Sequence, residues 1–415
     1  QDTISIKLED VDSEIDPVDD IEGAVAQAMR REGTLDRIKP GDSVCITAGS
    51  RDVANIARII RAICDQVKSV GAHPFIIPAM GSHAGAKAEG QRGIIEGYGV
   101  TEEAMGAPIR ASMDTEVIAH SKSGLEIHLD KFANAADFLI PVGRIKAHTD
   151  FRGEVESGIC KMLVIGMGKQ HGAYQCHKLG FKSMAANVKE FAGAIIEKKP
   201  NMFAIGLIEN AYHQTCRIEA IPAGRILAEE PPLLEYAKSR MAKVPFDQAD
   251  ILFVDETGKD ISGAGMDPNV TGRSPVLGIS RPFFQRIAVF DLTDKSHGNF
   301  GGLGSADVTT QRLYRKIDFE QTYPNGITAA EPLAVRLPAV MPSDRTAMQF
   351  ALRTATDCDW EKGPRIVWLK NTLSLSEFYI SEALIPDAEA LDNVTIVSEP
   401  MEVIFDEEGN VKELR

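Results

Sequence analysis

Three histidines and one lysine stand where side chains can transfer protons and bind ligands. His83 and His148 each follow a predicted strand, and Lys161 and His177 come sixteen positions apart further along the chain. Imidazole has an ordinary pKa of about 6.5, so it both takes and gives a proton near neutral pH. Two such groups on opposite sides of one substrate would suit an epimerisation, in which either face must be served.

The segment before Lys161 has a composition suited to an anion. Gly153, Ser157 and Gly158 offer backbone N–H groups and a hydroxyl, and Arg152 adds a second cation. We therefore predict a phosphate-binding loop made with Arg152, Ser157, Gly158 and Lys161. A Walker A pattern is absent, and no GxGxxG sequence follows a strand here, which disfavours standard NTPase and NAD-binding sites.

His171 and His177 are six positions apart, so a helix would not present both on one face. A helical pair of zinc ligands is therefore disfavoured. One of the two could still be a single metal ligand that an organic cofactor completes.

The charge of this part of the chain is opposite to that of the whole. The formal net charge is −15, which argues against nucleic acid as a partner because phosphate backbones are bound by basic surfaces. Between Arg144 and Lys178, however, six basic residues face three acidic ones, and three of the nine histidines lie there. Such a basic stretch can attract a small anion.

Three predicted strands position these residues. Residues 43–48 form a buried strand that leads into Gly49-Ser50-Arg51-Asp52 and then into a helical pattern. Residues 73–80 lead to His83, and residues 138–142 lead to His148. Because polar loops at the carboxyl ends of parallel strands meet at one edge of a sheet, we expect a common site there.

Alternating strand and helix patterns predict an α/β fold, and 415 residues predict two domains. We place the boundary near Gly272. Residues 1–272 would bind the cofactor and carry catalysis, residues 273–392 would bind substrate as a lid, and the site would lie in the cleft between them. The tail, 393–415, is expected to return to the first domain. Pro231-Pro232 is expected to separate two elements. Further strands are predicted at 203–208, 251–254, 287–292, 365–369 and 394–397, and helices at 184–198, 309–316 and 344–356.

The composition favours a cytoplasmic protein. No run approaches the roughly 18 apolar residues that span a bilayer, and the acidic N-terminus is unlike a signal peptide. Six cysteines form no CxxC pair, which is typical of reduced thiols. We expect neither a membrane nor a nucleic acid as partner.

The order of these motifs resembles a known family. Gly81-Ser82-His83, the run from Lys146 to Phe151, the run from Ser157 to Lys161, and His177 are together similar to the N-terminal domain of nickel-pincer-dependent lactate racemases. The loop Gly49-Ser50-Arg51-Asp52 also looks like a variant of the loop that follows the family's first strand. The resemblance covers roughly residues 40–215.

The resemblance implies a cofactor and a role for each residue. The cofactor is a nickel-pincer nucleotide, the Ni(II) complex of pyridinium-3,5-bisthiocarboxylic acid mononucleotide. It implies hydride transfer between substrate carbon and cofactor, while histidines move the hydroxyl proton. Cofactor-synthesis proteins are implied as partners. The implied roles are acid/base for His83 and His148, nickel ligand for His177, cofactor attachment (covalent in some members) for Lys161, nucleotide contacts for Ser50 and Arg51, and a phosphate contact for Ser157 with its neighbouring amides.

The chain departs from the lactate enzymes in ways that point to another substrate. Ala84 stands where the family often has arginine, and Asp294 to Asn299 occupy a loop where we expect a Tyr-Gln segment. Lys295 and His297 are the candidates for substrate recognition there. We therefore expect a racemase or epimerase of a 2-hydroxy acid or sugar acid, with lactate not the leading substrate.

Two alternatives stay open on the residues alone. His83, His148 and His177 could share a zinc-type ion in a metal-dependent hydrolase or lyase, although the same loops hold few carboxylates. The basic stretch could instead serve a non-catalytic nucleotide- or anion-binding protein.

Overall fold

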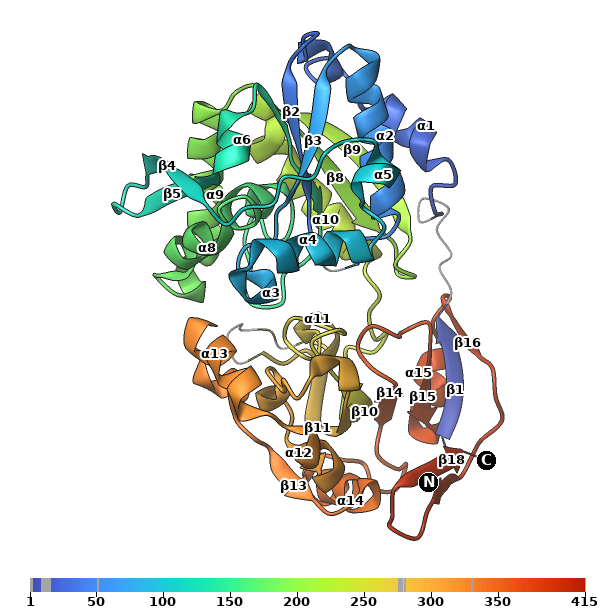
Figure 1. The fold of residues 1–415 in the computed structure, drawn as a ribbon. Helices are drawn as coiled ribbons and strands as arrows, with labels where there is room; N and C mark the ends of the chain where they lie inside the picture. Colours follow the sequence, from blue (N-terminus) through green and yellow to red (C-terminus); the bar gives the residue numbers. More distant parts are fainter. Residues whose placement is uncertain are drawn as a thin grey trace. The chain divides into compact units, whose positions relative to one another are not determined.

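The chain folds as two α/β units. The computed structural model describes residues 3–8, 16–50, 52–274, 279, 281–329 and 331–414. The N-terminal unit comprises Ser13–Met241, and the C-terminal unit comprises Gln1–Asp12 together with Ala242–Arg415 (Figure 1). The predicted α/β class is confirmed, since each unit combines helices with a largely parallel sheet.

Two three-stranded sheets form the centre of the N-terminal unit. They have the orders β3-β2-β6 and β7-β8-β9, and all neighbouring strands run parallel except β8 and β9. The Thr47 hydroxyl accepts a hydrogen bond from the Val142 N–H at 2.8 Å and so joins the two sheets. The parallel strands therefore end at one shared edge. Their bounds are β2 (Ser43–Ala48), β3 (His73–Pro78), β6 (Phe138–Ile140), β7 (Val142–Arg144), β8 (Phe203–Glu209) and β9 (Thr215–Pro222).

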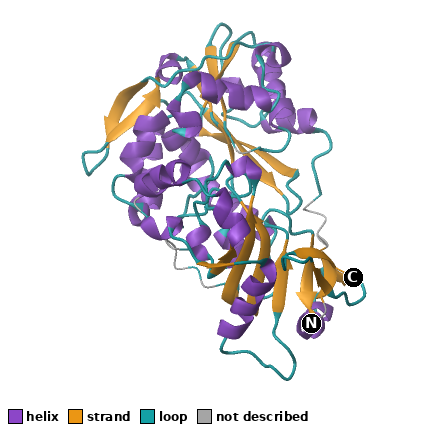
Figure 2. Cartoon of the chain, turned by 60° about the horizontal axis from the view of Figure 1, so that its bottom comes forward, coloured by secondary structure: helices purple, strands orange, loops and turns teal. Residues whose placement is uncertain are grey.

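Helices cover both faces of these sheets (Figure 2). The helix α2 (Ile56–Ser69) buries the apolar stripe that its sequence predicts, including Ile59, Ile63 and Val67. The helix α9 (Phe181–Lys198) buries Val188, Phe191 and Ile195 in the cluster on the other side. The remaining elements of this unit are α1 (Ile21–Ala28), α3 (His83–Ala86), α4 (Ala88–Gly97), α5 (Glu102–Met105), β4 (Thr115–His120), β5 (Glu126–Asp130), α6 (Lys131–Ala135), α7 (Ile159–Lys161), the π-helical segment Met162–Gly166, and α8 (Lys169–His177).

The expectation that Pro231-Pro232 separates two elements is wrong. Both prolines lie inside α10 (Ile226–Arg240). The helix continues through them because Ile226, Leu234 and Ala237 are buried against the neighbouring sheet and helices. The free energy gained by burying that face outweighs the local cost of the two N–H groups that the prolines lack.

The C-terminal unit is built on one eight-stranded sheet. The strand order is β13-β12-β11-β10-β14-β15-β1-β16, with parallel pairing from β13 to β14 and antiparallel pairing beyond. The strands are β1 (Thr3–Leu8), β10 (Gln248–Thr257), β11 (Phe283–Leu292), β12 (Val308–Thr310), β13 (Ala339–Met341), β14 (Ile366–Leu369), β15 (Glu377–Ser381) and β16 (Val394–Ile396), with a separate pair β17 (Val403–Phe405) and β18 (Val411–Leu414). The helices are α11 (Pro268–Thr271), α12 (Gln311–Lys316), α13 (Phe319–Ala329), α14 (Asp344–Thr354) and α15 (Ile385–Glu389).

The division of the chain differs from the expected boundary near Gly272. The units separate between Met241 and Ala242, because β10 pairs with β11 and β14 and so belongs to the C-terminal sheet. The tail also differs from expectation. It stays within the C-terminal unit, where β16 pairs with β1. Both differences arise from strand pairing between distant segments, which local sequence patterns do not encode.

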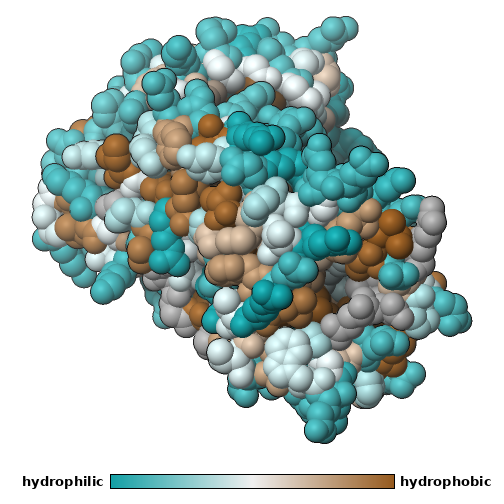
Figure 3. Space-filling model, turned by 90° about the horizontal axis from the view of Figure 1, so that it is seen from below, coloured by the Kyte–Doolittle hydropathy of each residue, from teal (hydrophilic) through white to brown (hydrophobic). Residues whose placement is uncertain are grey.

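No helix in the described ranges is long and apolar enough to cross a membrane. Large hydrophobic side chains nevertheless reach the surface of both units, among them Tyr174, Leu179 and Ile327. Figure 3 shows hydrophobic residues as brown patches within an otherwise hydrophilic face. Single exposed apolar residues of this kind are ordinary on folded proteins.

Candidate functional site

Ser50 and His83 come from the ends of two neighbouring parallel strands and meet. The Oγ atom of Ser50 lies 2.7 Å from Nδ1 of His83. The loop that holds His83 is fixed from within the fold, since the buried amide of Gln91 donates to the carbonyl oxygens of Gly81 at 2.8 Å and of His83 at 3.2 Å. The His83 imidazole is therefore half-buried, and its Nδ1 is held by the contact with Ser50.

His148 and Lys161 form a second pair. The Nε2 atom of His148 lies 2.7 Å from Nζ of Lys161, and the backbone N–H of Asp150 donates to Nδ1 of His148 at 2.9 Å. The ring also packs on Phe151, with ring centroids 4.1 Å apart. Both ring nitrogens and one ring face are thus held, so the position of His148 is well defined.

A buried carboxylate organises the loop of His148. Glu156 is fully buried and accepts a hydrogen bond from the backbone N–H of His148 at 2.7 Å. It also pairs with Lys238 at 2.9 Å and with Arg152 at 3.4 Å. A charge removed from water needs such partners, and here they tie the loop after β7 to α10.

His177, at the end of α8, presents one defined nitrogen. Its Nδ1 donates to the carbonyl oxygen of Ala173 at 2.6 Å, so the lone pair is on Nε2. Burial lowers the pKa of His177 below its ordinary value, which favours the neutral ring. Phe181 meets the ring edge-on, with centroids 5.8 Å apart. A neutral imidazole held in this way is the form that binds a metal ion.

Glycines near Ser50 and His83 pack against side chains of the segment that joins Lys161 to His177. A Cβ on Gly49, beside Ser50, would lie 3.2 Å from the side chain of Met162, beside Lys161. A Cβ on Gly81, two positions before His83, would lie 3.1 Å from Ile165 and 3.8 Å from Ala173, the residue that holds His177. Lys161 is also within electrostatic range of His177. The loops of Ser50 and His83 therefore lie beside the segment from Met162 to Ala173, as expected if Ser50, His83, His148, Lys161 and His177 surround one region.

Lys169 anchors the start of α8 in the interior. Its side chain is fully buried, its Nζ donates to the carbonyl oxygen of Pro78 at the end of β3, and it lies 3.3 Å from a carboxylate oxygen of Asp130. Burial lowers the pKa of Lys169 and raises that of Asp130, although each group opposes the shift of the other. The bond from Lys169 to Pro78 connects the strand before His83 with the helix that carries His177.

Two amides in and beside the predicted phosphate loop are hydrogen-bonded to buried carboxylates. The N–H of Cys160 donates to Glu230 at 2.9 Å, and the N–H of Gly153 donates to Glu156 at 3.4 Å. Burial raises the pKa of Glu230, and a Cβ on Gly158 would meet this carboxyl group at 2.0 Å. Glycine is needed at position 158 to admit Glu230, and the N–H groups of Gly153 and Cys160 have acceptors within the fold.

The other predicted ligands of the nucleotide are placed as follows. Arg152 is exposed, and its guanidinium donates to the carbonyl oxygens of His148 and Phe151. Ser157 is half-buried and its carbonyl oxygen accepts from the N–H of Lys146 at 3.0 Å. Arg51 lies outside the described residues. Phosphate contacts from Arg152 and Ser157 and a nucleotide contact from Arg51 stay predictions.

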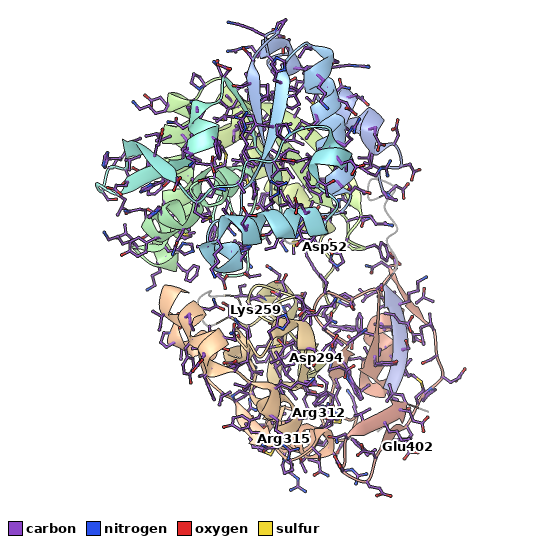
Figure 4. All side chains as sticks on the ribbon, in the orientation of Figure 1. Asp52, Lys259, Asp294, Arg312, Arg315 and Glu402 are labelled. Carbon is purple, nitrogen blue, oxygen red and sulfur yellow. The ribbon has the colours of Figure 1, made fainter. Side chains whose placement is uncertain are left out.

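Lys295 and His297, predicted to recognise substrate, lie in the C-terminal unit. Both are exposed, in and directly after the 3-10 turn Asp294–Ser296, and His297 has a left-handed φ of 49°. Asp294, labelled in Figure 4, opens this turn. Their role in recognition stays a prediction.

Within the described part of the chain, no group of three His, Cys, Asp or Glu side chains is arranged to hold a metal ion. His83, His148 and His177 therefore do not form a shared zinc-type site there. A single imidazole such as His177 fits a metal ion whose other ligands come from an organic molecule.

The residues that fix the site were not found from the sequence. Lys169 and Glu230 are distant along the chain from the groups that they hold, whereas Gln91 and Glu156 mostly hold groups within ten positions. Their residue type gave the one available signal. Three of the four are charged, and charged residues that are fully buried are rare unless they are paired. Burial itself could not be read for them, because each lies in a polar or mixed stretch.

Comparison with known proteins agrees with this arrangement. Residues 2–188 match the family model described as lactate racemase N-terminal domain. No curated protein matches the sequence. The lactate racemase apoprotein from Thermoanaerobacterium thermosaccharolyticum is 16% identical, with 90% of this chain and 99% of that chain covered and a TM-score of 0.56, and so has a similar fold. A protein from Thermotoga maritima matches at 12% identity over 68% of this chain and 72% of that one, with a TM-score of 0.44. Residues 2–188 therefore carry a domain similar to the lactate racemase N-terminal domain, and the fold of the chain resembles that of a lactate racemase.

Proposed function

We propose that this protein is a racemase or epimerase of a 2-hydroxy acid or sugar acid that uses a nickel-pincer nucleotide. The family supports an isomerase-type activity. The observation that carries the finer proposal is the grouping of two oriented imidazoles, His83 and His148, with a lysine amine and the metal-competent His177 around one region.

The donor set fits the proposed cofactor in two respects. His177 offers a neutral imidazole. Because its Nδ1 donates to Ala173, its Nε2 keeps the lone pair and could be the one remaining ligand of a metal ion. Lys161, which is within electrostatic range of His177, offers an amine that could hold the organic part of the cofactor. The cofactor, when bound, would supply a carbon that accepts and returns a hydride. The amides of Gly153 and Cys160 do not fit its phosphate, so Arg152 and Ser157 would contact it through side chains.

The protein's own residues would then move the hydroxyl proton. One imidazole removes it from the substrate as the carbon centre is oxidised, and the other returns a proton when the opposite face is reduced. Ser50 orients His83, while Asp150 and Phe151 orient His148, so neither ring has to search for its position. This arrangement serves both faces of one carbon, which racemisation requires.

The predicted substrate differs from lactate, because the residues expected to recognise it, Lys295 and His297, replace the segment expected in the lactate enzymes. Both are exposed and one is cationic, which suits a carboxylate or a polyhydroxylated chain.

The test is an assay of the protein co-produced with the cofactor-synthesis proteins. We would incubate it with a panel of chiral 2-hydroxy acids and aldonates in deuterated water. Inversion with little deuterium at the carbon supports hydride return, since enolisation would exchange the hydrogen with solvent. Inversion with full deuterium would refute the hydride route, and zinc without a chromophore would favour a hydrolase or lyase. Protein that carries neither metal nor activity would favour anion binding without catalysis.

A further inference from the structure

The helix α10 carries two side chains that reach the segments of Lys161 and His148. Glu230 is fully buried, and Lys238, whose side chain is 27% exposed, follows it on the same helix. The eight residues between these positions span about 12 Å along the helix axis, and the helical hydrogen bonds keep that span constant. The two groups are therefore held at a fixed separation by one helix.

Glu230 holds the turn that contains Lys161. This turn is the short helix α7, which begins after Gly158, and the first N–H groups of a helix have no acceptor within it. A serine or aspartate often supplies that acceptor from the position before the helix, but glycine has no side chain. Oε2 of Glu230 accepts from the N–H of Cys160 at 2.9 Å instead, and its Oε1 lies 2.0 Å from where a Cβ on Gly158 would be. The backbone beside Lys161 is thus fixed from α10.

Lys238 holds the loop of His148 through one carboxylate. Its Nζ lies 2.9 Å from Oε1 of Glu156, which is fully buried. The other oxygen of Glu156 accepts a hydrogen bond from the backbone N–H of His148 at 2.7 Å. A carboxylate without access to water depends on such partners, so a change at Lys238 reaches His148. The backbone of His148 is therefore also fixed from α10.

These contacts close into a circuit. Nζ of Lys161 lies 2.7 Å from Nε2 of His148, so the two paths from α10 meet at this contact. We propose that Glu230 and Lys238 are positioning residues that together set the distance between this amine and this imidazole. A misplacement of about 1 Å between reacting groups is enough to lower a rate by about a hundredfold. The proposal deepens the proposed function, on which the use of the two groups in catalysis rests.

The contact can be measured without cofactor or substrate, so the two proposals can fail separately. The test is a pH titration of the His148 ring by NMR, in full-length protein that carries ¹³C-labelled histidine and is made without cofactor-synthesis proteins. The signal of His148 is the one that His148→Gln removes. Lys161→Met gives the reference, which is the shift of the titration midpoint when the amine is absent. That variant leaves other charged or titratable groups around the ring in place, namely Asp150, whose carboxylate oxygen lies 3.9 Å from Nδ1, and Arg152, Glu156, His177 and Lys238.

Glu230→Ala removes the acceptor of the Cys160 N–H. We expect the His148 midpoint to move in the same direction as in Lys161→Met, because the amine is no longer held beside the ring. In the double variant the midpoint should equal that of Lys161→Met alone, since an effect that acts through Lys161 needs Lys161. Glu230→Gln, whose amide oxygen can still accept, should restore the wild-type midpoint. A wild-type midpoint in folded Glu230→Ala protein would overturn the proposal, and so would an undiminished shift in the double variant.

Glu229→Ala is the matched control. Glu229 precedes Glu230 on α10 but pairs with Arg31 at 2.7 Å, outside the circuit. Its loss should leave the His148 midpoint unchanged. An equal shift from Glu229→Ala would show that any weakening of α10 has this effect, and the assignment to Glu230 would be wrong.

Lys238→Met tests the other path, and it carries the test if Glu230→Ala does not fold. Methionine keeps an unbranched side chain at this partly exposed position but cannot pair with Glu156. We expect Lys238→Met to shift the His148 midpoint less in the Lys161→Met background than in the wild type, because part of its effect acts through the contact with Lys161. Equal shifts in the two backgrounds are what independent sites give, and they would remove Lys238 from the circuit.

Discussion

The Nδ1 atom of His177 lies 2.6 Å from the carbonyl oxygen of Ala173, one turn earlier on the same helix. This bond leaves Nε2 as the ligand atom. We expect His177→Ala to lower the nickel content of protein co-produced with the cofactor-synthesis proteins by about tenfold or more, since a protein ligand of the metal is removed. Elemental analysis of purified protein measures this content.

His171 provides the matched control for that variant. It lies on the same helix, is exposed, and stacks on His128 with ring centroids 5.5 Å apart. His171→Ala should keep its nickel. Equal nickel contents in the two variants would remove His177 from the metal site.

His83→Ala should separate binding from turnover. The ring is proposed to move a proton and not to hold the cofactor, so nickel content and the visible spectrum should be unchanged while kcat falls by about a hundredfold or more. Ser50→Ala leaves the ring but removes its 2.7 Å contact, and should cost less, about tenfold. A His83→Ala enzyme with full turnover on a confirmed substrate would contradict the acid/base role.

Glu156→Ala should destabilise the N-terminal unit. The change leaves Lys238, Arg152 and the His148 N–H without their buried acceptor, at a cost of about 3 kcal/mol. Thermal or urea unfolding followed by circular dichroism measures the loss. Glu235→Ala is the control, because Glu235 pairs with the same Lys238 but its side chain is 72% exposed, and its loss should cost about 1 kcal/mol or less. Similar losses in both variants would show that burial of Glu156 is not what matters.

Asp255 gives the C-terminal unit a defined pH dependence. Burial raises the pKa of Asp255 to about 6, against the stabilising bond from the Trp368 indole N–H at 2.6 Å. The folded state therefore holds this proton more tightly than the unfolded state does. Its contribution to stability is complete below pH about 4 and is lost as pH rises through about 6, by up to about 3 kcal/mol.

Asp255→Asn should remove that dependence. The amide oxygen can still accept from Trp368, and no charge forms at neutral pH. We expect the variant to gain more stability over the wild type at pH about 7 than at pH about 4. Asp294→Asn, at a side chain that is 93% exposed, is the control and should leave the pH profile unchanged. An identical gain at both pH values would argue against a buried ionisation at Asp255.

Much of the N-terminal unit could be predicted because its signals are local. The strands that end before Ser50 and His83 are short apolar runs closed by glycine, and α2 shows its buried face in the spacing of its isoleucines. From the predicted strands alone, Ser50, His83 and His148 could be expected to gather at one edge, whereas Lys161 follows no predicted strand. Which of these residues contact each other could not be predicted, because a 2.7 Å contact depends on side-chain rotamers that the sequence does not specify.

Other features depend on contacts between distant segments. The phosphate loop was predicted from Gly153, Ser157 and Gly158. Carboxylates from positions 156 and 230 accept from the N–H groups of Gly153 and Cys160, and nothing in the sequence near position 158 indicates Glu230. The boundary near Gly272 followed a glycine- and proline-rich stretch. That stretch proved to be a connection within one sheet, because β10 before it and β11 after it are paired.

The position of β1 in the sheet determines the order in which the two units can fold during synthesis. This strand is the first described segment to leave the ribosome, yet its neighbours in the sheet, β15 and β16, are among the last. All of Ser13–Met241 is translated between them, so that unit can fold during elongation while β1 waits unpaired. The final hydrogen bonds of the eight-stranded sheet close a loop of most of the chain, which makes their formation a late step of maturation. In nascent chains that stall after Met241, β1 has no partner strand.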